Sequence, residues 1–312
     1  MARQPAVSVV ISFLNAQDFL KDAIQSVFNQ TFEDWELVLV DDGSTDSSSS
    51  LAQAYARQDA DRIRYIEHAG HRNLGLPVSR NVGIRLARGE YVALLDADDM
   101  WFPEKLADQI AIMNAHAEVA MTWGCSLYWH QAGPDVTSVR SDFVQQAGVE
   151  VNSVYLPPGL LVRHLSERVA SPCPSDLLFR RAEILALGGF DETFTGMYAT
   201  YEDQAFLSKV YLKTPVFVSG SCWDRYRVHP MSMCAVVAAQ GQETNCYRFY
   251  LDWLSRYLLS EEVTDRDIWH YVRRARWYDR HPLLHRASRP VKFLARAIEN
   301  RILPLLLRPN EG

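Results

Sequence analysis

Blocks of apolar and polar positions alternate along the first 115 residues. The apolar runs Val7–Ser12 (VSVVIS) and Trp35–Val40 (WELVLV) are typical of strands buried inside a parallel sheet. Between them, residues 18–29 carry apolar side chains spaced by about four, which predicts a helix with one buried face. The alternation continues with predicted strands at 62–67 and 90–95 and predicted helices at 48–58, 78–87 and 103–115.

This alternation predicts an α/β fold with a Rossmann-like, mostly parallel sheet and flanking helices. From residue 116 the pattern loosens, and beyond Met231 it is mostly helical. We therefore expect residues 1–115 and 116–235 to be two halves of one domain, followed by a helical, basic extension at 236–312. The elements predicted in the second half are strands at 123–130, 177–181, 216–218 and 223–228 and helices at 181–187 and 202–211.

Composition narrows the class of protein. The 312 residues are 48% hydrophobic and 22% charged, as in globular proteins, and the net charge of −6 disfavours nucleic acid as a partner. Five cysteines without a CxxC pair fit a reduced cytoplasmic protein better than a disulfide framework or a zinc site. The sequence shows neither a signal peptide nor an apolar run long enough for a membrane span. We therefore expect a cytoplasmic location.

The charge is unevenly distributed. Residues 265–312 carry eleven Lys/Arg against five Asp/Glu, a net +6, which leaves −12 for residues 1–264. Aromatic residues such as Trp269 and Trp277 lie among these arginines. One interpretation is a peripheral contact of this tail with anionic lipid at the inner face of the membrane. The other is a helical cap on the domain with solvated arginines, and the sequence leaves both open.

Two acidic clusters follow predicted strands. Asp41 and Asp42 end the run at 35–40, and Asp96, Asp98 and Asp99 end the run at 90–95. In open α/β sheets, ligands bind outside the carboxyl ends of the strands. Alternate residues of an extended segment point the same way, so the carboxylates of Asp96 and Asp98 could face one Mg²⁺ or Mn²⁺ ion. The alternative is a solvated loop whose carboxylates cap the next helix.

Several short motifs follow one another in a fixed order along the chain. They are Val7–Asn15, Ser26–Phe32, Leu39–Asp46, Asn73–Gly75, Ser79–Ile84, Gly89–Tyr91, Asp96–Asp99, Gly188–Glu192, Glu202–Asp203 and Tyr226–Pro230. In this order the motifs resemble those of the family 2 glycosyltransferases of the GT-A fold. The similarity extends to about residue 235 and leaves the tail uncovered.

The resemblance implies a nucleotide-sugar donor, such as a UDP-, GDP- or dTDP-sugar. It implies that Asp98 holds a Mn²⁺ or Mg²⁺ ion bridging the diphosphate, with His229 near that ion. A packed, structural histidine is the alternative for His229. The residues implied or proposed to contact the donor nucleotide are Ser12, Asp41, Asp42, Asp96 and Arg80, of which Arg80 could instead have a structural role at a helix start.

The resemblance also implies that Asp203 is the general base of an inverting transfer to a hydroxyl group. The acceptor would be a sugar or lipid-linked sugar in cell-surface polysaccharide or glycolipid synthesis. Glu202 and Trp223 are candidates for the acceptor region. The alternatives are that Glu202 and Asp203 only favour a helix dipole and that Trp223 is a core residue.

Two other functions compete. A nucleotidyltransferase would need a basic, glycine-rich phosphate loop after the first strand, but the loop Phe13–Gln17 has no basic residue. Neither GxGxxG nor GxxxxGK[ST] occurs, so dinucleotide and P-loop sites do not explain the sheet. A catalytically inactive nucleotide- or sugar-binding protein is the second rival. The presence of both Asp98 and Asp203 argues against it.

Overall fold

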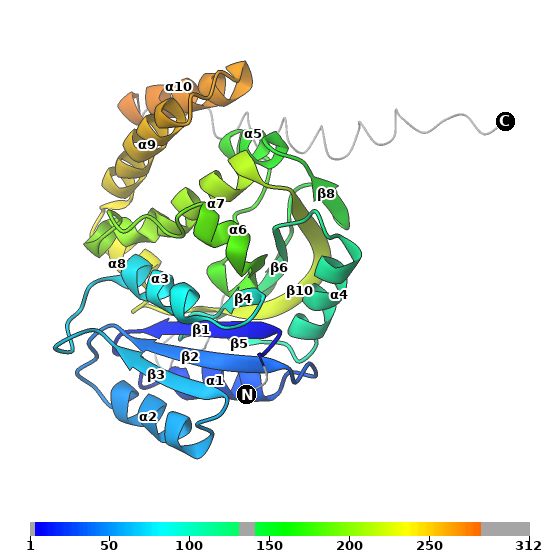
Figure 1. Ribbon diagram of the computed structural model, residues 1–312. Coiled ribbons are helices and arrows are strands. Elements are labelled where there is room, and N and C mark those ends of the chain that lie inside the picture. The colour runs from blue at the N-terminus through cyan, green and yellow to red at the C-terminus, as the bar shows by residue number, and fades with distance from the viewer. Residues whose placement is uncertain (1–3, 131–140, 282–312) are drawn as a thin grey trace.

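The first half of the sheet is built from the four strands that the apolar runs predict. The computed structural model describes residues 4–130 and 141–281 (Figure 1). Strands β1 (Val7–Phe13) and β2 (Trp35–Asp41) are buried along their whole length, as their unbroken apolar pattern requires. The strand β3 (Ile63–Glu67) pairs with β2, and β4 (Tyr91–Leu94) pairs with β1, all in parallel.

Helices cover both faces of these strands. Figure 1 shows α2 on one side of the parallel strands and α3 and α7 on the other. Successive residues of β1 enter two different hydrophobic cores, Val9 on one face and Val10 on the other, because strand side chains alternate. The predicted α/β class is thereby confirmed. The helices that flank the sheet are α1 (Leu20–Phe28), α2 (Ser48–Gln58), α3 (Leu76–Leu86), α4 (Lys105–Ala115), α6 (Arg181–Ala186) and α7 (Glu202–Lys213).

The second half of the sheet mixes strand directions. The short strand β9 (Leu178–Arg180) runs antiparallel to both β4 and β6 (Met121–His130), and β6 runs parallel to β10 (Val216–Val228). The main path of the sheet has the order β3-β2-β1-β4-β9-β6-β10-β5. The sequence predicts the position of β9 but not its direction, since direction depends on the connections on either side.

Some elements differ from the predicted ones. The two strands predicted between residues 216 and 228 are one strand, β10, because two register shifts after Val218 let it continue past the polar residues in its middle. Several short elements escape the sequence patterns because two to seven residues contain too little periodicity. These are β5 (Met100–Trp101), β7 (Phe143–Gln145), β8 (Ser153–Tyr155), α5 (Gly159–Leu165), η1 (Pro174–Asp176) and η2 (Gly196–Tyr201).

Each of the three helices of the extension contacts the domain. The helices are α8 (Met233–Ala239), α9 (Glu243–Ser260) and α10 (Arg266–Arg280). The Trp253 indole donates to Asp191 at 2.7 Å, and Leu254 is buried in the core that α7 also enters. Residues 282–312, the rest of the predicted basic tail, lie outside the described residues. Among the helices that the structure describes, none combines the length and apolar content needed to cross a bilayer.

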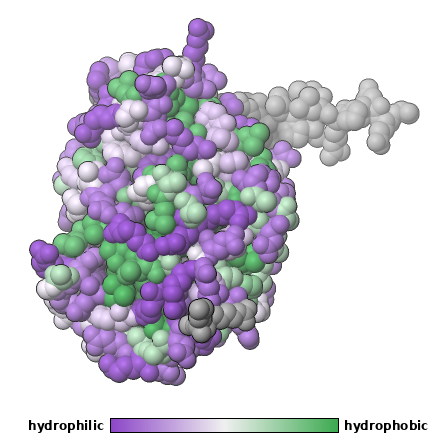
Figure 2. Space-filling model, in the orientation of Figure 1, coloured by the Kyte–Doolittle hydropathy of each residue, from purple (hydrophilic) through white to green (hydrophobic). Residues whose placement is uncertain are grey.

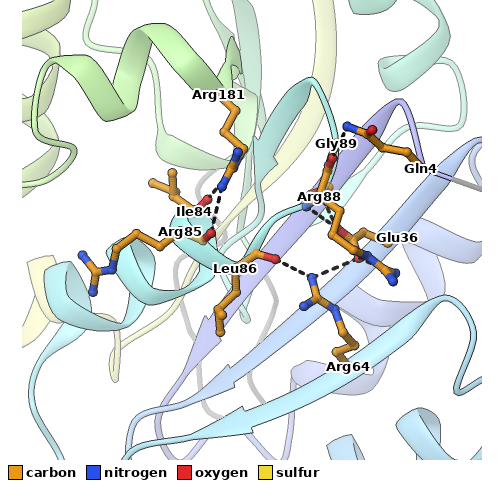
Figure 3. A network of polar contacts seen from close by, with 10 residues as sticks. Gln4, Glu36, Arg64, Ile84, Arg85, Leu86, Arg88, Gly89 and Arg181 are labelled. Atoms are coloured by element: carbon orange, nitrogen blue, oxygen red, sulfur yellow. Dashed lines mark hydrogen bonds and ion pairs between the residues drawn. The ribbon is translucent and has the colours of Figure 1, made fainter. Parts of the chain in front are cut away.

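A network of ion pairs surrounds the buried carboxylate of Glu36 at the amino ends of the parallel strands (Figure 3). The Glu36 carboxylate on β2 accepts hydrogen bonds from Ser8 Oγ at 2.6 Å, from the backbone N–H and Nε of Arg88, both at 2.7 Å, and from Arg64 Nη2 at 3.0 Å. Arg64 also donates to the Leu86 carbonyl at 2.7 Å, at the end of α3. Burial alone raises the pKa of Glu36, but these hydrogen bonds and charges outweigh it and hold the pKa below its usual value.

Candidate active site

The acidic clusters meet at the opposite edge, where the parallel strands end. Because β1 lies between β2 and β4, the segments after these three strands are neighbours in space. Phe13, at the end of β1, is in register with Asp41, and Val10 is in register with Leu94 shortly before Asp96. The sheet therefore brings together the two carboxylate clusters that are far apart in the sequence.

Asp41 organises the turn after β2. Its carboxylate accepts hydrogen bonds from the backbone N–H of Ser44 at 2.8 Å and of Gly43 at 3.1 Å. The Ser49 hydroxyl donates at 2.5 Å and the Tyr65 hydroxyl at 2.9 Å. Four donors occupy the lone pairs of this carboxylate, which favours a local structural role, and the donor contact predicted for Asp41 stays a prediction.

Asp42 fixes the loop that follows β3. Its oxygens accept from the backbone N–H of Leu74 at 2.8 Å and of Gly75 at 3.0 Å, and His68 Nε2 lies 3.4 Å away. Nearby at the end of β1, Ser12 Oγ is buried and has no hydrogen-bond partner among the described residues. An unsatisfied buried hydroxyl is a natural contact for a ligand, so Ser12 stays the better supported of the predicted nucleoside contacts.

Arg80 connects the two halves of the domain. It lies buried on α3, and its guanidinium forms ion pairs with Asp96 after β4 and with Glu202 at the start of α7. The guanidinium also lies over the Phe190 ring, 5.2 Å from its centroid. Both planar ends of the arginine fork are therefore engaged by protein carboxylates. This arrangement favours the structural alternative for Arg80 and ties Glu202, predicted for the acceptor region, into the same contact.

Asp203 differs from its neighbour Glu202. While Glu202 is buried against Arg80, Asp203 makes its hydrogen bonds among the described residues with its own neighbour Gln204, whose backbone N–H donates at 2.7 Å. Burial of the carboxylate raises the pKa of Asp203 to about 6, and the charge of Asp96 adds to the rise. A carboxylate with a pKa near neutrality that is not held by an ion pair is suited to accept a proton.

Asp98 and His229 form a pair. His229 Nε2 and Asp98 Oδ2 are 2.9 Å apart, and the His229 ring packs beside Phe19 with 4.7 Å between ring centroids. The second ring nitrogen, His229 Nδ1, is buried without a partner among the described residues. Asp98 Oδ2 and His229 Nε2, at 2.9 Å, are spaced as two ligands of one divalent cation such as Mn²⁺ would be, whereas Nδ1 is on the opposite edge of the ring. These two residues, predicted together from the sequence, would both be within reach of one ion.

Arg227 holds the acidic turn in place. Its backbone N–H donates to Asp99 Oδ1 at 2.8 Å, and its Nε donates to the backbone carbonyl of Asp98 at 2.7 Å. The guanidinium lies between the rings of Phe19 and Trp129, at 5.0 and 4.5 Å from their centroids. Sequence reasoning missed this residue, although it stands two positions before His229 in the Tyr226–Pro230 motif.

A second acidic group lies beneath this turn. Oxygens of Asp99 and Asp224 and the sulfur of Cys173 lie within 4.8 Å of one another, all buried. Cys173 donates to Asp224 at 3.0 Å and Ser175 donates to Asp99 at 2.6 Å. Burial, followed by the charge of Asp224, raises the pKa of the Cys173 thiol well above its usual value. A protonated thiol suits Mn²⁺ or Mg²⁺ less than carboxylate oxygens, so Asp98 is the better candidate for such an ion.

Trp223 is not at the surface. Its side chain is 2% exposed, and the indole N–H donates to Asp108 at 3.0 Å. That Trp223 lies in the acceptor region stays a prediction. The core alternative, which aromatic residues favour in general, is the one that the structure supports.

Comparison with known proteins agrees with this geometry. Residues 8–137 match the family described as "Glycosyl transferase family 2". This match identifies a family 2 glycosyltransferase domain within residues 8–137. The putative teichuronic acid biosynthesis glycosyltransferase TuaG of Bacillus subtilis is 40% identical over 133 residues, which are 42% of this chain and 51% of TuaG. The putative glycosyltransferase EpsH of the same organism is 27% identical over 73% of this chain and 62% of EpsH.

Solved structures of similar fold place this chain in the GT-A fold. TarS residues 1–349 from S. aureus, in complex with UDP-GlcNAc, superpose with a TM-score of 0.56 and 22% identity over 73% of this chain and 60% of TarS. The mannosyltransferase PcManGT from Pyrobaculum calidifontis, in complex with GDP-Man and Mn²⁺, has a TM-score of 0.56 and 16% identity, over 96% of this chain and 87% of PcManGT. At these identities the likeness concerns the fold. The chain covers less than two thirds of the length of TuaG and of EpsH.

Proposed function

We propose that this chain transfers a sugar from a nucleotide-diphospho-sugar to a hydroxyl acceptor, with inversion at the anomeric carbon, in cell-surface polysaccharide or glycolipid synthesis. The observation that carries the proposal is the difference in pairing between the adjacent carboxylates of Glu202 and Asp203. Glu202 forms an ion pair with Arg80, whereas Asp203 has no ion-pair partner among the described residues and a pKa raised to about 6. This is the state that a general base needs near neutral pH.

The donor would lie at the edge where β1, β2 and β4 end. The unsatisfied hydroxyl of Ser12 supports a contact with the nucleoside, and the loop that Asp42 anchors would form the wall beside it. UDP-, GDP- and dTDP-sugars are all candidates, since the fold neighbours carry UDP-GlcNAc in one case and GDP-Man in the other.

The divalent ion would be held by Asp98 and His229, with Mn²⁺ or Mg²⁺ as the expected species. When bound, such an ion stabilises the negative charge that develops on the departing diphosphate. Arg227 keeps the Asp98 backbone at its place through the 2.7 Å hydrogen bond from Nε. Because Asp98 is partly exposed while Asp99 is buried, the ion would be reached from the donor side of the turn.

Asp203 would remove the proton from the attacking hydroxyl. The acceptor oxygen forms a bond to the anomeric carbon as the bond to the diphosphate oxygen breaks, and the hydroxyl proton passes to the carboxylate. Attack from the face opposite the diphosphate inverts the anomeric centre and requires no covalent enzyme intermediate. A position of the base close to the carboxylate expected beside the ribose is supported by Arg80, which pairs with both Asp96 and Glu202, the neighbour of Asp203.

The test is Asp203→Asn, measured by release of nucleoside diphosphate from a panel of nucleotide-sugars with Mn²⁺. We expect the transfer rate to fall by about 10²- to 10⁴-fold while donor binding is retained. The matched control is Asp267→Asn on the exposed face of α10, which should transfer at the wild-type rate. Unchanged transfer in Asp203→Asn would remove Asp203 as the base.

A peripheral membrane contact is a second proposal, supported by α10. Arg276 of α10 forms an ion pair with Asp252 of α9, and Arg248 of α9 forms one with Asp279 of α10. The negative charges of both aspartates are therefore neutralised between the two helices. The residues of α10 that remain exposed are Arg266, Asp267, His270, Arg273, Trp277 and Arg280. Binding to vesicles with and without anionic lipid tests this contact, which Arg273→Glu should weaken and which should diminish with salt.

A further inference from the structure

The helix α8 is apolar and yet exposed. It reads MCAVVAA, and of its seven residues only Val237 is buried. Met233 and Val236 are each 40% exposed, and Met231, just before the helix, is 66% exposed. The surface seen in Figure 2 is largely hydrophilic with apolar residues gathered in limited areas. Exposed apolar patches of this kind mark binding sites more often than scattered apolar residues do.

This helix lies beside the proposed catalytic residues. The Ser232 N–H donates to the His229 carbonyl at 3.2 Å, and the Ser232 hydroxyl caps the helix by accepting from Ala235 N–H at 3.3 Å. The segment η2, which packs against α8, runs directly into Glu202 and Asp203. The helix therefore borders the space in which an acceptor hydroxyl must lie to reach Asp203.

The side chains on this surface indicate what it can bind. Met197 on η2, at 38% exposed, joins Met231 and Met233, and these three are the exposed methionines among the residues that the structure describes. Methionine side chains are flexible and polarisable, so they adapt to an apolar partner of irregular shape. A sugar ring needs hydrogen-bond partners for its hydroxyl groups, and the α8 side chains other than the Cys234 thiol offer none.

We infer that α8 and Met197 bind the hydrocarbon chain of a lipid-linked sugar acceptor. The inference rests on the proposed function, because the position of Asp203 is what makes the occupant of α8 a part of the acceptor. The sugar end of that acceptor then lies toward Asp203, and its carrier chain lies along Met231, Met233 and Val236. The surface thus selects acceptors by their carrier as well as by their sugar.

The test compares two acceptor analogues that differ only in the chain. Binding of decyl β-D-glucopyranoside, below its micelle concentration, and of methyl β-D-glucopyranoside is measured by calorimetry on the full chain with UDP and Mn²⁺. We expect the decyl compound to bind at least about tenfold more tightly. The double variant Met233→Ser/Val236→Ser should lose about tenfold in affinity for the decyl compound and leave UDP binding unchanged. Met231→Gln, in the loop before the helix, should act in the same direction without touching α8 itself.

The matched control is Leu259→Ser. Leu259 is 66% exposed near the end of the 18-residue helix α9, which puts it about 24 Å along that helix from its first residue. This variant should bind both glucosides as the wild type does. A general effect of surface apolarity would instead lower decyl binding in Leu259→Ser as much as in the α8 variant, and would overturn the inference.

Other outcomes also overturn it. Equal affinity for the two glucosides, or decyl binding that α8 variants leave intact, removes the hydrocarbon site from α8. Loss of phosphatidylcholine vesicle binding in the α8 variant, with decyl binding intact, would make α8 a bilayer contact. Loss of a dimer in sedimentation velocity, again with decyl binding intact, would make it a contact between two copies. The outcome for Asp203→Asn is independent, so failure of the lipid site and failure of the proposed base can be distinguished.

Discussion

The two edges of the parallel half-sheet differ at groups other than their best-paired carboxylates, since Asp41 at the carboxyl edge accepts four hydrogen bonds just as Glu36 does at the amino edge. At the amino edge, both oxygens of Glu36 are filled by Ser8, Arg64 and Arg88. At the carboxyl edge, Ser12 Oγ and His229 Nδ1 are buried without partners among the described residues, and Asp203 has no ion-pair partner there. The strands are the same, so the difference comes from the loops.

The comparison teaches which edge stabilises the fold and which is available for chemistry. A buried polar atom without a partner costs about 1–3 kcal/mol, and the carboxyl edge bears that cost at more than one position. Sites that break a local rule in this way are where a ligand is expected to supply the missing partner. A change of pH and three substitutions at these two edges test whether the edges differ in this way.

The largest effect should come from pH. Because Asp203 must be ionised to accept a proton and its pKa is raised to about 6, the transfer rate should be full above pH 7. Below pH 6 it should fall about tenfold for each pH unit. The measurement is kcat/KM against pH, with donor binding followed over the same range. An acidic limb that persists unchanged in the residual activity of Asp203→Asn would assign the titration to another group.

The next effect concerns the amino edge. Glu36→Ala leaves Ser8 and two arginines without their acceptor, and we expect the free energy of unfolding to fall by roughly 3 kcal/mol in urea titrations. Nucleotide binding of the folded variant should be unchanged. Since the pKa of Glu36 is lowered in the folded state, its contribution is present above its unfolded pKa and is lost as the pH falls through the folded pKa. A variant that loses donor affinity without losing stability would contradict the division between edges.

A smaller effect is expected at Arg227. The variant Arg227→Lys keeps a positive charge but cannot reproduce the guanidinium contacts with the Asp98 backbone and the two flanking rings. The affinity for Mn²⁺ in the presence of UDP should weaken about tenfold, in the range seen for residues that orient metal ligands. UDP binding without a metal ion should change much less. Equal weakening with and without Mn²⁺ would point to a general loss of structure.

The smallest effect should be at Ser12. Replacing it by alanine removes an unsatisfied buried hydroxyl, so Ser12→Ala should leave the free energy of unfolding unchanged or raise it by up to about 1 kcal/mol. The same change should weaken nucleotide binding several-fold. Thermal unfolding with and without UDP measures both quantities in one experiment. Lower stability together with unchanged UDP binding would show that the hydroxyl serves the fold and not the donor.

Much of the fold could be predicted because several of its strands coincide with runs of consecutive apolar residues. The apolar runs at 7–12 and 35–40 are long enough to identify, and they locate the edge at which Asp41 and Asp96 meet. The short strands β5, β7 and β8 leave no such pattern. The antiparallel direction of β9 is a property of its connections and not of its three residues.

The candidate site was predicted less completely, because its roles depend on long-range pairs. Asp98 and His229 were predicted together and lie 2.9 Å apart. The different roles of Glu202 and Asp203 could not be predicted from the sequence. They depend on Arg80, which forms an ion pair with Glu202 from a helix distant in the sequence. The same holds for Arg227 and Asp99, which are 128 residues apart. The burial of Trp223, which favours the core alternative over the acceptor region, could not be predicted from the sequence.

The double ion pair of Arg80 has a consequence for how this gene can vary. The single side chain of Arg80 neutralises the carboxylates of Asp96 and Glu202, which lie in the two halves of the domain. A substitution at this position therefore destabilises both halves at once. Lysine would keep the charge but has no fork to reach both partners. In a library of random variants selected for folded protein, position 80 should therefore be among the most depleted, with lysine no better tolerated than neutral residues.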